Sequence, residues 1–294
     1  MRILHIMWNM NIGGAERAVY QLIREQRENS IDSNILVLNK SGYYAGLLNK
    51  EFGNVRVLGT EKQLTPGSKK DFMKILTDYT AIHFHSAEFR YIAHASKNRE
   101  IKKYYTHRAG IHNFTLKQKI RHKVTGFYLR KYFTAFSSNT IHAGKSAAGV
   151  YKIPQNKFLL TYNGIDFSLL MPRLPKESIQ NKLFVKNNIV IGTTANIRKW
   201  KRIDILIKLM QNFKEENIKL LIVGDGPEKE GLKILARNLG VHNNVIFVSK
   251  AENIADYLQI MDIFILPSNE AESFGNSAVE AMGFGIPTLV FQDG

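Results

Sequence analysis

The chain has 294 residues, no cysteine and a formal net charge of +16, and 44% of its residues are hydrophobic. This composition predicts one large or two ordinary folded domains and excludes a disordered chain. The lack of cysteine excludes disulfides and thiolate metal sites and fits a cytoplasmic protein. The N-terminal apolar run, residues 3–8, is too short for a signal peptide, and no run approaches the ~18 apolar residues of a membrane-spanning helix.

The positive charge lies in the first part of the chain. Residues 1–175 hold 27 Lys or Arg against 11 Asp or Glu, whereas residues 176–294 hold 14 of each. Within the first part, residues 97–131 hold eleven basic residues and a single acid, Glu100. This asymmetry predicts two domains with different partners, and a surface this basic attracts anionic lipid, nucleic acid or an acidic polymer.

In chain order, short apolar segments alternate with helical patterns, which predicts mainly parallel, doubly wound sheets. The first set of expected strands comprises residues 3–8, 35–38, 55–58, 81–84, 104–106, 133–136 and 158–161. The second set comprises residues 190–194, 220–223, 245–248, 263–266 and 288–291, with helices near 201–214, 228–239, 251–260 and 275–283. We therefore expect an α/β protein of two Rossmann-like domains that face a cleft, residues 1–170 and 189–294, joined by a linker at 171–188.

Two glycine motifs in the first half have different interpretations. Gly13-Gly14 follows the first expected strand and opens a helix, which suits an anionic ligand, although an ordinary turn explains the same residues. A nicotinamide cofactor is disfavoured, because no G-x-G-x-x-G motif occurs and the second strand ends in Leu38-Asn39-Lys40 without an acid. Gly144-Lys145-Ser146 imitates the end of a P-loop, but Asn139 stands where that loop needs its first glycine, so we expect a helix surface.

Four histidines lie near expected strand ends: His83, His85, His107 and His112. His107 follows the strand that would meet the cleft, where an imidazole can hydrogen-bond a ligand hydroxyl or shuttle a proton. A metal site is disfavoured, because no carboxylate or second histidine stands at a tight ligand spacing around His107. For His83 and His85 a structural role is the better interpretation.

The basic segment 97–131 and the residues after it also carry apolar side chains, namely Phe114, Leu116, Ile120, Val124, Phe127, Tyr128, Tyr132 and Phe133. Their helical spacing predicts an amphipathic cationic helix. It is either a packed helix with a solvated charged face or a helix that lies on an anionic membrane surface. Nucleic acid is the weakest interpretation, because no recognised nucleic-acid-binding fold accompanies the charge.

In the second half, polar residues gather where expected strands end. The strand at 190–194 is followed by a group that suits a diphosphate, formed by Asn196, Arg198, Lys199, Lys201 and Arg202. The next strand ends in a glycine turn, Val223-Gly224-Asp225-Gly226-Pro227. The strand at 263–266 opens into a loop with Glu270 and Glu272, and a helix with Glu280 follows. Open α/β sheets bind ligands at this carboxyl edge, beside helix N-termini.

Taken in order, these motifs resemble the family 4 retaining glycosyltransferases of the GT-B fold. The matching set is Gly13-Gly14-Ala15-Glu16, Asn163-Gly164-Ile165-Asp166, Lys201 before Ile203-Asp204-Ile205, Val223-Gly224-Asp225-Gly226-Pro227, Leu266-Pro267-Ser268, and Glu272 with Glu280. The two glutamates, with seven residues between them, are the family's signature. The resemblance implies a nucleotide-sugar donor, a UDP-sugar, in the second domain and a saccharide or lipid-linked acceptor in the first. It implies neither a cofactor nor a metal.

The resemblance also implies roles by position. Lys201 would neutralise the diphosphate as the bond to the anomeric carbon breaks, and Glu280 would bind the donor ribose. Glu272 would hold the donor sugar, and His107 would lie near that sugar as a further catalytic residue. The remaining donor-binding positions are Gly13, Gly14, Asn196, Arg198, Gly226, Phe274, Gly275, Asn276 and Ser277.

Two features depart from the family pattern. An arginine often stands five residues before the lysine, where this chain has Asn196, so we expect Arg198 or Lys199 to supply that charge. Family members usually continue beyond the position of Gly294, so we expect a C-terminally truncated second domain. The expected function is a glycosyltransferase of cell-surface polysaccharide synthesis (capsule, exopolysaccharide or lipopolysaccharide), cytoplasmic and peripheral on the inner face of the cytoplasmic membrane. The alternative is a non-catalytic homologue that binds a membrane or a partner through 97–131.

Overall fold

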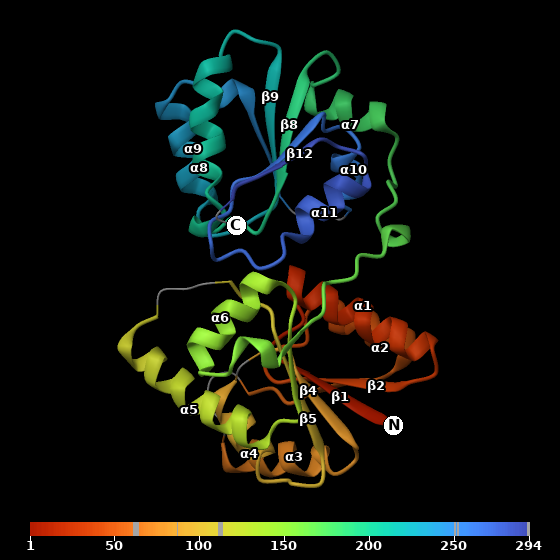
Figure 1. The fold of residues 1–294 in the computed structure, drawn as a ribbon. Coiled ribbons are helices and arrows are strands. Elements are labelled where there is room, and N and C mark those ends of the chain that lie inside the picture. Colours follow the sequence, from red (N-terminus) through yellow and green to blue (C-terminus); the bar gives the residue numbers. More distant parts are fainter. Residues whose placement is uncertain (61–64, 87, 111–113, 250, 252, 293–294) are drawn as a thin grey trace. The chain divides into compact units, whose positions relative to one another are not determined.

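The computed structural model describes residues 1–60, 65–86, 88–110, 114–249, 251 and 253–292 (Figure 1). The chain forms two compact units, Met1–Gly164 and Ile165–Gly294. Each unit is an α/β domain with its own parallel sheet and its own apolar cores.

The first unit is built on a seven-stranded parallel sheet in the order β3-β2-β1-β4-β5-β6-β7. Its strands are β1 (Arg2–Met7), β2 (Asp32–Val37), β3 (Val55–Val57), β4 (Ala81–Phe84), β5 (Lys102–His107), β6 (Ala135–Ser138) and β7 (Phe158–Leu160). Its helices are α1 (Gly14–Glu28), α2 (Tyr43–Phe52), α3 (Pro66–Leu76), α4 (Phe89–Ala95), α5 (Leu116–Tyr132), α6 (Ile141–Tyr151) and the short η1 (Gln155–Lys157).

Both faces of this first sheet are buried, as the central strand β1 illustrates. Successive side chains of a strand point to opposite faces, so Leu4 and Ile6 share one face and Met7 lies on the other. Leu4 and Ile6 belong to the core that contains apolar residues of α3, α4, α5 and α6. Met7 belongs to the core that contains Val19 and Ile23 of α1. Near-continuous burial of this kind is typical of a parallel strand covered by helices on both sides.

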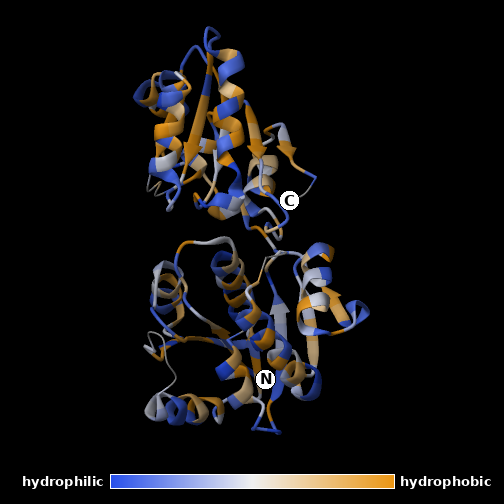
Figure 2. Ribbon diagram, turned by 90° about the vertical axis from the view of Figure 1, so that its left-hand side faces the viewer, coloured by the Kyte–Doolittle hydropathy of each residue, from blue (hydrophilic) through white to orange (hydrophobic). Residues whose placement is uncertain are grey.

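The second unit has a five-stranded parallel sheet in the order β10-β9-β8-β11-β12. Its strands are β8 (Ile189–Thr194), β9 (Ile218–Val223), β10 (Val245–Val248), β11 (Ile263–Leu266) and β12 (Thr288–Val290), and Figure 2 shows their hydrophobic character. Its helices are α7 (Lys176–Leu183), α8 (Ile203–Leu209), α9 (Lys229–Asn238), α10 (Ala255–Leu258) and α11 (Asn276–Gly283). Short 3-10 turns are η2 (Phe167–Leu169), η3 (Lys199–Lys201), η4 (Met210–Phe213) and η5 (His242–Asn244).

The second sheet also packs against an apolar core on each face. Phe264 and Leu221 share one core with Ala281 of α11 and Ile179 of α7, whereas Ile222 lies in the other core. The segment 171–188, which the sequence suggests as a linker, therefore contains a helix, α7, whose Ile179 is fully buried in the second unit.

Strand order reverses once in each sheet, between β1 and β4 and between β8 and β11. Such a reversal is a topological switch point, and ligands of open α/β sheets bind beside it at the carboxyl ends of the strands. The prediction of two doubly wound α/β domains is confirmed. The expected helix at 201–214 starts later, at Ile203, because Arg202 has a left-handed backbone with φ of 51°. None of the described helices is both long and apolar enough to cross a bilayer.

Candidate functional site

The switch point of the second sheet brings together residues that follow three strands. Lys201 follows β8, Gly226 follows β9 and Glu272 follows β11, and these three strands are neighbours in the sheet. Because all strands are parallel, their carboxyl ends meet at one edge. The edge therefore holds cationic, glycine-rich and acidic groups side by side.

An ion pair joins the two sides of this switch point. Lys201 Nζ donates to Glu272 Oε2, and Ser268 Oγ donates to the same oxygen at 3.0 Å. The side chains of Lys201 and Glu272 are only 11% and 12% exposed, so the pair is largely screened from water. The Lys201 ammonium also lies 4.4 Å from the centre of the Trp200 ring, in cation–π geometry. The pairing and the Trp200 contact were not predicted from the sequence.

The loops around the pair are held by main-chain bonds. Asn269 N donates to Trp200 O at 3.0 Å and Glu272 N donates to Asn269 O at 2.9 Å, which ties the loop after β11 to the loop after β8. The glycine turn after β9 packs closely on the same region. A Cβ on Gly224, whose φ is +144°, would lie 1.9 Å from Ala195 O. Only glycine fits there, because the position combines an unusual φ with backbone contact.

The N-terminus of α11 completes the edge. Gly275 adopts a left-handed φ of 73° and precedes Asn276, the first residue of the helix, and Ala278 N donates to Gly275 O at 2.8 Å. Phe274 lies before this turn and Ser277 within the first helical turn. Free N–H groups and the helix dipole make such an N-terminus attractive to anions. Glu280 lies further along α11 and is 4% exposed.

The predicted cationic group after β8 is divided by the structure. Lys201 is buried against Glu272, whereas Asn196, Arg198 and Lys199 are exposed. Arg198 and Lys199 lie at the surface of the second unit and form no side-chain contact with the described residues that assigns them to the site. The expectation that one of them replaces the missing arginine remains a prediction.

In the first unit, the predicted Gly13-Gly14 motif forms the start of α1. Gly13 is the N-cap with extended backbone, and Arg17 N donates to Gly13 O at 2.9 Å. The Glu16 carboxylate lies against Gly13, where an added Cβ would be 2.3 Å from Glu16 Oε2. Burial raises the pKa of Glu16, so this carboxylate sits in a partly desolvated position at the helix N-terminus.

His107 ends β5 and is 7% exposed. Tyr105 Oη and His107 Nδ1 lie 3.0 Å apart, and Tyr105 Oη donates to Tyr151 Oη at 3.2 Å. His107 also meets the Tyr151 ring edge-on. These contacts fix the imidazole at the carboxyl edge of the first sheet. His112 lies outside the described residues.

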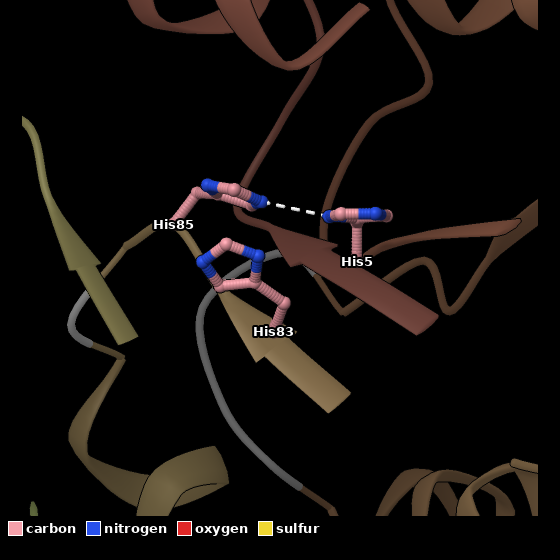
Figure 3. Close-up of side chains that lie close together, drawn as sticks. All are labelled: His5, His83 and His85. Carbon is pink, nitrogen blue, oxygen red and sulfur yellow. Dashed lines mark hydrogen bonds between the residues drawn. The ribbon is translucent and has the colours of Figure 1, made fainter. Parts of the chain in front are cut away.

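Three other histidines gather on β1 and at the end of β4 in the first unit: His5, His83 and His85 (Figure 3). Each offers a ring nitrogen within 4.8 Å of the others, a spacing that makes the group a candidate for metal binding. Two of these histidines instead belong to a chain of hydrogen bonds in which each group donates to the next, from Arg108 to Gln26. Arg108 Nε donates to His85 Nδ1 at 3.4 Å, which places the proton of His85 on Nε2, and this nitrogen lies 2.9 Å from His5 Nδ1. His5 Nε2 then donates to Gln26 Oε1 at 2.8 Å.

This chain requires neutral imidazoles whose facing nitrogens share a proton. Burial lowers the pKa of His5 to about 4 and holds the pKa values of His83 and His85 well below 6.5, and the charge of Arg108 acts in the same direction. A metal ligand must offer a free lone pair, whereas His85 Nε2 carries the shared proton and a guanidinium stands beside the group. Hydrogen bonding therefore accounts for the group better than a metal does, which agrees with the structural role expected for His83 and His85.

Helix α5 forms as predicted, but its apolar stripe faces outward. Its buried residues are Thr125, Gly126 and Leu129, while its exposed apolar side chains are Leu116, Ile120, Val124 and Phe127, between 40% and 76% exposed. The helix nevertheless packs on the first unit through small residues and Leu129, with Tyr128 and Tyr132 against the core, so it is a packed helix with a solvated charged face. Whether the exposed stripe also contacts a membrane remains a prediction. Gly144 and Ser146 lie buried on α6, and only Lys145 of that trio is at the surface.

Two parallel-sheet α/β domains of this design define the GT-B class of fold. The crystal structure of Anabaena HepE in complex with UDP and glucose aligns with the whole chain at a TM-score of 0.86 and 20% identity, over 81% of HepE. A crystal structure of WaaG, a glycosyltransferase involved in lipopolysaccharide biosynthesis, aligns with 99% of the chain at a TM-score of 0.70 and 14% identity, over 81% of WaaG.

Sequence similarity points in the same direction. Residues 175–294 match the Glycosyl transferases group 1 family. EpsF of Bacillus subtilis, named as a glycosyltransferase, is 25% identical over 306 residues, covering 98% of this chain and 78% of EpsF. The O-antigen biosynthesis glycosyltransferase WclY of Escherichia coli is 29% identical over 163 residues, covering 52% of this chain and 43% of WclY.

Proposed function

We propose that the protein is a retaining glycosyltransferase that moves a sugar from a UDP-sugar to a saccharide or lipid-linked acceptor in cell-surface polysaccharide synthesis. The observation that carries this proposal is the Lys201–Glu272 pair at the switch point of the second sheet, beside the N-terminus of α11. A cation, a carboxylate and the dipole of a helix N-terminus match the diphosphate and the hydroxyls of a nucleotide-sugar. The names of HepE bound to UDP and glucose and of the O-antigen enzyme WclY support the choice of donor and pathway.

In the proposed reaction, charge develops on the leaving diphosphate. Lys201 turns from Glu272 to the diphosphate and stabilises that charge, together with the backbone of Phe274 and Gly275 and the N–H groups of α11. Glu272, once released, accepts hydrogen bonds from donor-sugar hydroxyls, and Glu280 binds the ribose. Because a side chain supplies the positive charge, neither a metal nor a cofactor is required.

In this proposal the first unit binds the acceptor. His107 is held at the sheet edge by Tyr105 and Tyr151, and in this proposal its imidazole hydrogen-bonds a sugar hydroxyl or shuttles a proton. Gly14 is exposed at the start of α1 and carries no side chain, so in this proposal a ligand approaches the backbone closely there.

Helix α5 is the proposed membrane contact, which would place the enzyme on the inner face of the cytoplasmic membrane. Its outward stripe, Leu116, Ile120, Val124 and Phe127, is flanked by Lys117, Lys119, Arg121, Lys123, Arg130 and Lys131. Exposed apolar side chains between cations suit the boundary between anionic headgroups and acyl chains. Replacing Leu116 and Ile120 by serine should reduce binding to phosphatidylglycerol vesicles without lowering the melting temperature, because neither residue is in the core.

Thermal protection by UDP tests the proposal for the second unit. UDP should raise the melting temperature of the wild-type chain, and Lys201→Ala or Glu280→Ala should abolish most of that shift. Lys208→Ala serves as a matched control, because Lys208 follows the same strand but pairs with Asp204 on the exposed side of α8. A wild-type chain that no nucleotide stabilises would refute the donor site. Vesicle binding without any nucleotide binding would favour the non-catalytic alternative.

A further inference from the structure

Arg108 carries a positive charge that no carboxylate of the described residues neutralises. Its Nη1 donates to Asn163 Oδ1 at 2.5 Å and its Nε donates to His85 Nδ1 at 3.4 Å, and both acceptors are neutral. Within the described parts of the chain, it forms no ion pair with Asp or Glu. Burial lowers the pKa of Arg108 to about 10, so the guanidinium remains charged near neutral pH.

The side chains that are hydrogen-bonded to Arg108, directly or through His85, are uncharged. The chain from His85 through His5 ends on Gln26, whose Oε1 also accepts from Ser33 Oγ at 2.6 Å. Proteins usually pair a buried cation with a carboxylate, because an uncompensated buried charge is costly. Here neutral groups orient the guanidinium and leave its charge available. A purely structural arginine would not need this arrangement.

Arg108 also lies where a ligand is expected. It follows His107 at the carboxyl end of β5, and its side chain reaches His85, the residue directly after β4. Strand β4 borders β1, so the guanidinium stands beside the switch point of the first sheet. Open α/β sheets bind their ligands at this position.

We propose that Arg108 is a substrate-binding residue of the first unit and that it binds a phosphate group carried by the sugar acceptor. This proposal rests on the proposed function, in which the first unit holds the acceptor. Two of the five N–H groups of the guanidinium bond to Asn163 and His85. The other three form no hydrogen bond with the described residues, and in this proposal they bind the phosphate. The acceptor is then a phosphorylated molecule, either a lipid-linked sugar or a soluble sugar phosphate.

The test uses the full chain with Lys201→Ala, so that the donor site of the second unit contributes little to phosphate binding. Inorganic pyrophosphate is titrated at constant ionic strength and followed by calorimetry and by thermal shift. Adding Arg108→Gln should weaken pyrophosphate binding about tenfold, and Arg108→Lys should weaken it less, because lysine keeps the charge but loses the planar fork. Arg99→Gln, an exposed arginine of the same unit, is the matched control and should change binding little.

Two further probes distinguish the sources of the phosphate. Farnesyl diphosphate that binds more tightly than pyrophosphate, while farnesol does not bind, supports a lipid-linked acceptor, and equal binding of both phosphates supports a soluble one. The proposal is overturned if the Lys201→Ala chain does not bind pyrophosphate, or if Arg108→Gln binds it as well as its parent. It is also overturned if Arg99→Gln weakens binding as much as Arg108→Gln. If Arg108→Gln does not fold, Arg108→Lys decides, and unchanged affinity in that variant overturns the proposal.

The proposed function is judged separately, by UDP protection of the wild-type chain. If UDP protects the wild type and Arg108→Gln equally while the loss of Arg108 leaves pyrophosphate binding unchanged, only the phosphate proposal fails. If no nucleotide protects the wild type but pyrophosphate binding depends on Arg108, the donor site fails and Arg108 remains a phosphate ligand.

Discussion

The buried histidines of the first unit should make its stability depend steeply on acid pH. His5 has a pKa of about 4 in the folded chain against 6.5 for an exposed histidine. The unfolded chain therefore binds more protons between these two values, so the free energy of unfolding rises with pH in this window. The contribution is fully present above pH 6.5 and is lost as pH falls to about 4. At about 1.4 kcal/mol per pH unit, His5 alone accounts for about 3 kcal/mol.

His83 and His85 act in the same direction, because burial also lowers their pKa values. The free energy of unfolding should therefore depend on pH more steeply than His5 alone would make it, above about 1.4 kcal/mol per pH unit. Urea unfolding at several pH values between about 4.5 and 7.5 measures this slope. The chain has two tryptophans, so in a Trp200→Phe background the fluorescence of Trp8 reports on the first unit.

Replacing His5 by glutamine isolates one of the three protons. Glutamine can accept from His85 and donate to Gln26, so the hydrogen-bonded chain persists without a titrating group at position 5. The slope should become shallower by about 1.4 kcal/mol per pH unit. His242→Gln, an exposed histidine of the second unit, should leave it unchanged. A wild-type slope near zero between pH 6.5 and 4, or identical slopes in His5→Gln and wild type, would refute the neutral-histidine chain.

Three other outcomes follow from the second unit. Glu272→Gln should lower its stability by roughly 2–3 kcal/mol in urea unfolding, because Lys201 is left largely buried without its carboxylate; unchanged stability would contradict a screened ion pair. Gly224→Ala should destabilise by more than about 2 kcal/mol, because the added Cβ meets Ala195 O, whereas Gly231→Ala, in open space on α9, should be neutral or stabilising. Adding EDTA or zinc should change neither UDP protection nor melting temperature, and loss of UDP protection with EDTA would reveal a metal-dependent site.

Sequence patterns predicted the sheets well, since short apolar runs between helical patterns have few other solutions. They also placed Lys201 and Glu272 at the same sheet edge, because both follow parallel strands of the second unit. Their direct pairing was not predictable, since it depends on side-chain directions and on the short turn η3. The exposure of Arg198 was not predictable for the same reason. It depends on the backbone path into η3, which the spacing between Arg198 and Lys201 in the sequence does not reveal.

Periodicity alone left open which way the apolar stripe of α5 faces. The spacing of Leu116, Ile120 and Val124 predicts one apolar stripe on the helix. The spacing does not tell whether that stripe faces the core or the solvent. The helix packs against Tyr151 through Gly126. An added Cβ at this position would lie 2.2 Å from Tyr151 O, so only glycine permits this close approach. The histidine chain was missed for a related reason. His5 and His83 are opposite each other in the register of β1 and β4, and strand register becomes visible only in the structure.

The ion pair of Lys201 with Glu272 has a consequence for selectivity. Any anion that approaches Lys201 competes with a carboxylate that is tethered nearby and therefore present at high effective concentration. Chloride offers no hydrogen-bond donor to the displaced carboxylate, which would be left partly buried without its cation. A ligand that brings both a diphosphate for the lysine and hydroxyl donors for the glutamate satisfies the two groups at once. Under the proposed function, the pair would therefore favour a ligand with both kinds of group over a simple anion.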